Sequence, residues 1–177
     1  MTPQGARRES PPLGDLLKLL SQFDRAWQAG AAPRIEDSLA RAGNSSASGE
    51  LLEELIKVDL EYRWRQVAGP GAAERPRLEE YLRRFPQLGP LDRLPAEMIA
   101  EEYRVRHRWG DCPGHAEYAV RFPGRPALGE SLSRVDADLA TERQMTDDGA
   151  RRLRAEASAE PAPSAVTSVA ALVDAIL

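Results

Sequence analysis

The feature that most constrains the fold of this chain is a short segment that occurs twice, begun by a proline and ended by Arg-Phe-Pro. The first copy spans residues 75–86 and the second spans residues 113–123. Proline suits the first turn of a helix, where its missing N–H is not needed, and a second proline prevents the helix from continuing. Each copy therefore predicts a short amphipathic helix. The residues that define the motif are Pro76, Tyr81, Arg84, Phe85, Pro86, Pro113, Tyr118, Arg121, Phe122 and Pro123.

Longer helices are predicted between these segments, where apolar residues recur at steps of three and four. Alanine, arginine, proline, glutamate and leucine dominate the sequence, whereas β-branched and aromatic residues are scarce, which favours helices over sheets. We therefore predict an all-α fold, a compact irregular bundle of long and short helix pairs joined by proline turns, with a flexible C-terminal tail. The predicted long helices span residues 15–27, 50–67 and 95–109, and a degenerate short copy spans residues 33–41.

The apolar pattern divides the chain into four parts. Residues 1–10 are polar and predict a disordered N-terminus, and residues 11–125 form the helical repeat module. Residues 126–166 have few apolar side chains and end in a stretch rich in proline and alanine, so we expect a polar helix and linker that are largely flexible. Residues 167–177 begin a further amphipathic helix and stop within its pattern, which indicates a fragment of a longer protein.

The spacing of the motif is typical of helix pairs that bury each other's faces. The two Arg-Phe-Pro elements lie 37 positions apart, and two Glu-Tyr-Arg elements lie 41 positions apart. This register pairs Tyr62 with Tyr103 on the long helices and Tyr81 with Tyr118 on the short helices. We interpret the tyrosines as core or rim residues whose hydroxyls reach water, and the alternative is an aromatic surface that binds a partner.

The charge and cysteine content restrict the location and partners of the chain. The formal net charge is −4, whereas binding of nucleic-acid phosphates draws on a positive field. Cys112 is the only cysteine, so no internal disulfide can form, which favours a reducing, cytoplasmic location. No apolar run approaches the ~20 residues that a membrane-spanning helix needs, so we expect no membrane insertion.

No residues form a recognisable catalytic constellation. Phosphoryl transfer by a kinase needs a glycine-rich phosphate loop, a lysine for the phosphates, and catalytic and metal-binding aspartates. Gly69-Pro-Gly71 is too short for that loop, and the sequence contains no Asp-Phe-Gly. Adjacent acidic pairs such as Glu79-Glu80 and Glu101-Glu102 point apart on a helix and predict a solvated face. We therefore expect no enzymatic activity and no cofactor.

The spacing of His107, Cys112 and His115 could supply three metal ligands. Zinc sites use four protein ligands, or three and a water, so Asp111 would have to complete a closed site. The interpretation that we favour is a turn that holds a buried small thiol and a half-exposed histidine. A Cys–His nucleophilic pair would also need oxyanion donors and an orienting residue near Cys112, and the sequence indicates neither.

One group of residues combines basic and aromatic side chains on the predicted long helices. Such a group can bind RNA or DNA by stacking and phosphate contacts, or it can bind acidic or phosphorylated protein segments. Acidic neighbours cancel much of its positive field, which favours the protein segments. The residues are Arg63, Trp64, Arg65, Arg104 and Arg106.

Together these elements resemble the N-terminal extension of large Planctomycetes-type serine/threonine protein kinases. The resemblance covers residues 12–125, and its most specific part is Tyr-x-x-Arg-Phe-Pro. Residues 168–176 are also similar to the segment that leads into the kinase domain in that family. The catalytic motifs of the family lie in a part that this chain does not contain. The matching segments are residues 23–30, 33–37, 51–56, 59–63, 76–81 and 84–86.

The resemblance and the missing catalytic motifs favour a non-catalytic regulatory or protein-interaction module, as in the N-terminal region of a bacterial serine/threonine protein kinase. Its partner would be a downstream kinase domain or another signalling protein. One alternative is a nucleic-acid-associated regulator that uses the arginine and tryptophan face. Another is a fragment whose full-length protein is an ATP-dependent serine/threonine kinase.

Overall fold

The computed structural model describes residues 13–43, 48–66 and 75–159, and this part of the chain contains helices and turns but no strand. The predicted all-α fold is therefore confirmed. In chain order the elements are α1 (Leu13–Gln28), α2 (Ile35–Ala42), α3 (Ser48–Arg65), α4 (Leu78–Arg84), two 3₁₀ turns η1 (Pro86–Leu88) and η2 (Leu91–Arg93), α5 (Ala96–Trp109), α6 (His115–Arg121) and α7 (Leu128–Ala159).

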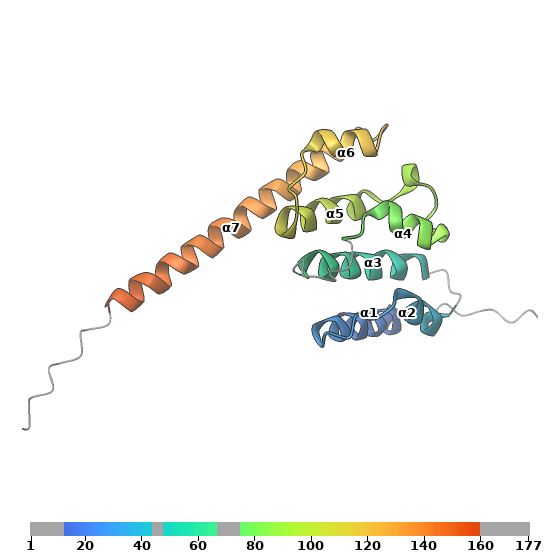
Figure 1. The fold of residues 1–177 in the computed structure, drawn as a ribbon, viewed down its shortest axis with the longest axis horizontal. Coiled ribbons are helices and arrows are strands. Elements are labelled where there is room, and N and C mark those ends of the chain that lie inside the picture. Colours follow the sequence, from blue (N-terminus) through green and yellow to red (C-terminus); the bar gives the residue numbers. More distant parts are fainter. Residues whose placement is uncertain (1–12, 44–47, 67–74, 160–177) are drawn as a thin grey trace, which may run out of the picture. The chain divides into compact units, whose positions relative to one another are not determined.

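The helices lie in successive layers, with α1 and α2 first, then α3, then α4 and α5, and then α6 (Figure 1). Helix α3 contacts α1 and α2 on one side and α5 on the other. Its apolar face is wide enough to serve both neighbours, because Leu55, Ile56 and Leu60 are all 0% exposed. Burial of each of these side chains stabilises the fold by about 1.5–3 kcal/mol.

The two copies of the proline motif form the short helices α4 and α6, as predicted. Before α4, the backbone N–H of Arg77 donates to the Glu80 carboxylate at 3.0 Å, which satisfies one N-terminal donor. Both helices end in the same way, because the N–H of Phe85 donates to the Tyr81 carbonyl and that of Phe122 to the Tyr118 carbonyl. The proline that follows each phenylalanine has no N–H with which to extend the helix.

Helix α7 differs from the prediction of a largely flexible polar helix and linker over residues 126–166. Leu128, Leu132 and Val135 are buried, at 5%, 1% and 3% exposure. They are spaced four and three positions apart, so they form one narrow stripe even though polar residues outnumber them. The first compact unit consequently ends at Ala137 and not at residue 125, and residues 126–137 are not a flexible linker. The second unit begins at Asp138, and its described residues are the remainder of α7, where Met145 and Leu153 are exposed.

The boundaries of α3 also differ slightly from the prediction. The helix begins at Ser48, two residues before the predicted start, and the Ser48 hydroxyl donates to the Gly43 carbonyl at 2.8 Å. The helix ends at Arg65, two residues before the predicted end.

Several predictions concern residues outside the described ranges. They are the disordered N-terminus at 1–10, the helix end at residue 67, the linker over 160–166 and the new helix over 167–177. Among the helices of the described ranges, none is both long enough and apolar enough to cross a membrane.

Candidate functional site

The tyrosines of the two motif copies make the same contact to a buried carboxylate on a long helix. The Tyr81 hydroxyl donates to Asp59 at 2.6 Å, and the Tyr118 hydroxyl donates to Glu102 at 2.9 Å. Burial, together with the negative charge of the acceptor, raises the pKa of both tyrosine hydroxyls. The expectation that these hydroxyls reach water is therefore wrong, because each one holds a short helix against a long one.

The arginines of the motif are also equivalent in their contacts. Arg84 donates two hydrogen bonds to Glu36, both of 2.7 Å, and Arg121 donates two to Glu79, of 2.9 and 2.7 Å. Each short helix is thus joined to the preceding short helix by a bidentate ion pair. The bonds from Arg84 hold the pKa of Glu36 below its usual value. Burial opposes this effect at Glu79, but the bonds from Arg121 bring its pKa below the usual value as well.

These contacts set the register of the long helices at 43 positions. Asp59 and Glu102 are 43 positions apart, and so are the two glutamates that accept the arginines. The predicted register of 41, which pairs Tyr62 with Tyr103, is therefore wrong. The register of 41 is inferred from the Glu-Tyr-Arg triplet that both long helices contain. The equivalent residues of the two helices are instead the buried carboxylates that accept the motif tyrosines.

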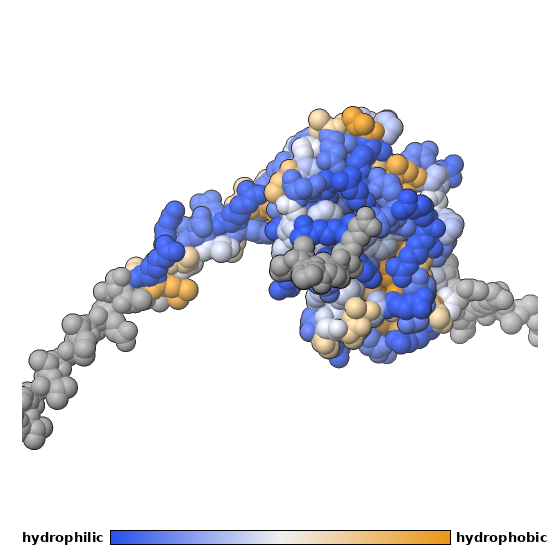
Figure 2. Space-filling model, viewed as in Figure 1, coloured by the Kyte–Doolittle hydropathy of each residue, from blue (hydrophilic) through white to orange (hydrophobic). Residues whose placement is uncertain are grey.

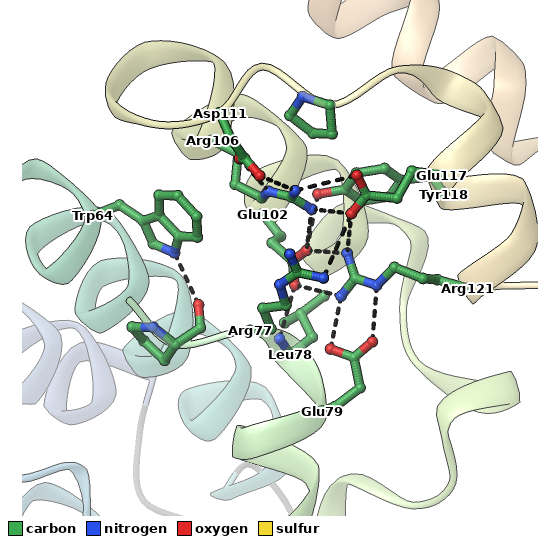
Figure 3. Close-up of polar contacts among 12 residues, drawn as sticks. Trp64, Arg77, Leu78, Glu79, Glu102, Arg106, Asp111, Glu117, Tyr118 and Arg121 are labelled. Carbon is green, nitrogen blue, oxygen red and sulfur yellow. Dashed lines mark hydrogen bonds and ion pairs between the residues drawn. The ribbon is translucent and has the colours of Figure 1, made fainter. Parts of the chain in front are cut away.

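Of the two buried carboxylates that accept a motif tyrosine, Glu102 has the larger hydrogen-bond network (Figure 3). It is 0% exposed, and it accepts the N–H of Leu78 at 2.8 Å, the hydroxyl of Tyr118 and two bonds from Arg121. Leu78 is the first residue of α4, so Glu102 satisfies an N-terminal donor of that helix and lies near the positive end of its dipole. The expectation that acidic pairs form a solvated face is wrong at Glu102.

Arg106 lies one helical turn after Glu102 and is also fully buried. Its guanidinium donates to Asp111 at 2.9 and 2.6 Å and to Glu117 at 2.6 Å (Figure 3). Burial opposes the charge of Arg106, but these bonds raise its pKa above the usual value. A buried charge with several acidic partners is costly to assemble and still more costly to disrupt, so this cluster has a structural role.

The predicted arginine and tryptophan surface does not form. Trp64 is 5% exposed and Arg106 is 0% exposed, so neither can meet a partner in solution. Arg63 and Arg104 each pair with an acidic residue on their own helix, at 2.7 Å in both cases, and Arg65 is exposed. The available signal was an acidic residue four positions before Arg63 and before Arg106, which indicates ion pairs along one helix.

Trp64 instead joins α3 to the start of the first motif copy. Its indole N–H donates to the carbonyl of Pro76 at 2.8 Å (Figure 3). The ring lies so close to the backbone of Gly110 that a Cβ at that position would overlap it. Trp64 therefore fixes the entry into α4 and the exit from α5, and glycine is required at residue 110 by this close approach.

The three residues of the hypothetical metal site make other contacts. His107 Nε2 lies 2.9 Å from the Pro113 carbonyl, and His115 Nε2 lies 2.8 Å from the Asp136 carboxylate. Cys112 is exposed, so the prediction of a buried thiol is wrong. Within the described ranges no three histidine, cysteine or acidic side chains gather closely enough to hold a metal ion.

An open apolar cleft of about 510 Å³ lies between α6 and the first turns of α7, within the first compact unit. Figure 2 shows hydrophobic residues over α6, and Val120 of this helix, which does not line the cleft, is 81% exposed. At its edge, His115 donates to the Asp136 carboxylate, which also accepts the Tyr103 hydroxyl. The lining residues are His115, Ala116, Ala119, Phe122, Gly124, Arg125, Pro126, Leu128, Gly129 and Leu132.

A second cleft, of about 450 Å³, is lined by Arg63, Pro76, Glu80, Tyr81, Arg83 and Arg84. Two of its three arginines are already neutralised, because Arg63 donates to Asp59 and Arg84 donates to Glu36. The remaining positive charge is modest, so the cleft is a weaker candidate for ligand binding than the apolar one.

Comparison with models of protein families, with curated proteins and with solved structures finds no match to this chain.

Proposed function

We propose that this chain is a non-catalytic protein-interaction module that binds a partner protein in the cleft between α6 and α7. The observation that carries the proposal is the cleft itself, where the exposed Ala116, Ala119 and Pro126 form an open apolar floor. Open apolar clefts of this size are typical of binding sites, and exposed apolar surface marks sites of protein interaction.

The use of the charged groups supports a non-catalytic role. A catalytic carboxylate or arginine must reach a substrate, whereas Glu102 and Arg106 are 0% exposed and bonded to other parts of the fold. The same is true of the motif tyrosines, whose hydroxyls donate to buried carboxylates. These residues hold the layers together, so we assign partner binding to the cleft.

The resemblance to kinase N-terminal extensions gives the module a context. In a longer protein of that kind, it would recruit a signalling partner to the kinase domain or position that domain. The hypothesis of a nucleic-acid-associated regulator has less support, because its proposed face includes the buried Trp64 and Arg106.

Site-specific photo-crosslinking in the native cells tests the proposal. A benzophenone amino acid at Ala116, which lies in the cleft, is expected to crosslink the full chain to a defined partner protein. Ala119→Arg should abolish this adduct because it places a charge on the apolar floor. Val120→Arg is the matched control, since residue 120 is on the same helix but does not line the cleft.

Crosslinks that survive Ala119→Arg would show that the cleft does not select them, and the proposal would then fail. Nucleic acid recovered in the adducts would favour the nucleic-acid alternative.

A further inference from the structure

The first turns of α7 repeat a pattern of α3 and of α5 with the residue before its N-cap, in which two apolar residues and an acidic residue follow at steps of four. In α3 the acidic residue is Asp59, in α5 it is Glu102, and in α7 it is Asp136. All six apolar residues of the pattern are buried, at 5% exposure or less. The three sets are Leu51, Leu55 and Asp59; Leu94, Met98 and Glu102; and Leu128, Leu132 and Asp136.

The acidic residues of the second and third sets meet the same position of the short helix before them. Glu102 accepts the backbone N–H of Leu78 at the start of α4, and Asp136 lies 2.8 Å from the ring Nε2 of His115 at the start of α6. Leu78 and His115 are 37 positions apart, the interval between the two motif copies. The start of α7 is therefore a third long helix of the repeat, and α6 is the short helix that precedes it.

In the second repeat, the surface made by α4 and α5 is covered by α6 and the residues after it. Arg121 donates to Glu79 of α4, and Arg125 donates to the carbonyls of Leu91 and Leu94, at 3.0 and 2.5 Å. Together with the bond from Tyr118 to Glu102 of α5, these contacts identify α4, α5 and the turn η2 as the surface on which α6 and Arg125 pack.

The equivalent surface in the third repeat is the apolar cleft. Ala116 occupies the position of Glu79 in the motif, and Leu128 and Leu132 occupy the positions of Leu94 and Met98. All three residues line the cleft. Within the described residues, no short helix follows α7, so the third repeat has no equivalent of the α6 that packs on the second.

We propose that the cleft binds a short amphipathic helix of a partner protein, of the same kind as α4 and α6. Its apolar face would cover Ala119 and Pro126, which are exposed in the cleft, and a tyrosine hydroxyl or a guanidinium on it would donate to Asp136. That carboxylate is 44% exposed and, among the described residues, accepts two of the roughly four hydrogen bonds that a carboxylate can accept. The inference rests on the proposed function and specifies its partner.

A peptide of residues 75–88, with acetylated and amidated ends and a fluorescent label, is the probe, because it contains the sequence of α4. It is expected to bind the full chain saturably, in the range of about 10 µM to 1 mM, since a short helix must be ordered on binding. Ala119→Arg should weaken binding by at least about tenfold, and Val120→Arg should change it by less than about twofold. Fluorescence anisotropy measures each affinity.

A gain of affinity gives the sharper test. Ala116→Glu restores at this position the carboxylate that accepts Arg121 at Glu79 and Arg84 at Glu36. It should strengthen peptide binding by about three- to tenfold, the effect of one bidentate ion pair. A peptide with Arg84→Gln should lose that gain, and its affinity for the unmodified chain should change little.

Three results would overturn the inference. They are the absence of saturable binding up to about 1 mM peptide, equal weakening by Ala119→Arg and Val120→Arg, and no gain from Ala116→Glu. A dimer in light scattering that Ala119→Arg dissociates would identify a second copy of the chain as the occupant instead of a partner protein. If the peptide fails but the crosslinks at Ala116 persist, this inference fails and the proposed function stands; the loss of both refutes both.

Discussion

The two complete repeats, α2–α3–α4 and α4–α5–α6, differ most at their central acidic residue. Glu102 uses both oxygens, because it accepts donors from the backbone of α4 and from two side chains of α6. Asp59 accepts Tyr81 and Arg63 through one oxygen, and its buried Oδ1 has no hydrogen-bond partner among the described residues. One methylene group therefore separates a carboxylate that joins three helices from one that joins two.

The difference also shows how the repeat stays specific without regular spacing. The intervals of 37 and 43 positions differ, but the tyrosine, the arginine and their carboxylate acceptors meet in both repeats. Directional hydrogen bonds to buried charges fix which helix pairs with which, whereas apolar packing alone tolerates alternatives.

The largest effect is expected from removing the centre of the second repeat. Glu102→Ala should lower the free energy of unfolding by about 3–5 kcal/mol, because the Leu78 N–H and the Tyr118 hydroxyl lose their acceptor and the cation of Arg121 loses a buried acidic partner. Asp59→Ala should cost less, about 2–3 kcal/mol, since the Arg63 side chain is partly exposed. Urea denaturation followed by circular dichroism measures both, with the exposed Glu97→Ala on α5 as the control. Equal losses at the two sites would contradict the comparison.

A second prediction concerns the tyrosine hydroxyls, and here the larger loss of stability is expected in the first repeat. Tyr81→Phe leaves Asp59 with Arg63 as its remaining donor, so we expect a loss of about 2–3 kcal/mol. Tyr118→Phe leaves Glu102 with the Leu78 N–H and the guanidinium groups of Arg121 and Arg106, so the loss should be about 1 kcal/mol. The same denaturation experiment compares them. A larger loss for Tyr118→Phe would show that Glu102 depends on this hydroxyl despite its other partners.

The sequence predicts the helices well because each has a local signal. Proline at the start and Phe-Pro at the end determine α4 and α6, and apolar periodicity determines α3 and α5. The candidate site could be predicted less well. Burial of Glu102 depends on donors from three other segments, and α6–α7 cleft formation depends on a sparse apolar stripe at Leu128 and Leu132.

A smaller, stabilising effect is expected from making the first repeat resemble the second. Asp59→Glu adds the methylene that Glu102 has, which should allow the second oxygen to reach the N-terminal N–H groups of α2. The Arg34 position before α2 provides no side-chain cap. The variant should gain up to about 1 kcal/mol in unfolding free energy, the typical contribution of an N-terminal cap. The reverse variant, Glu102→Asp, is the matched control and should be destabilised; a loss in both would show that the first repeat has no room for the longer side chain.

The smallest effect is the pH dependence of the two bidentate pairs, Glu36–Arg84 and Glu79–Arg121. Both carboxyl groups have a folded pKa below the usual value, so each pair contributes stability above the unfolded pKa of about 4.3 and loses it as the pH falls through the lower folded pKa. Each contribution should be about 1 kcal/mol or less, because both carboxylates are 37% exposed and solvent screens them.

Glu36→Gln and Glu79→Gln should therefore differ from the unmodified chain by a constant amount between pH 7 and about 5.5, and by less at lower pH. The difference for Glu79→Gln should resist added salt more strongly, since the side chain of Arg121 is 12% exposed and that of Arg84 is 37% exposed. Urea denaturation at several pH values and salt concentrations measures both dependences. If the two differences respond to salt in the same way, the second repeat shields its ion pair from solvent no better than the first. The greater stability expected of the second repeat would then come from Glu102 alone.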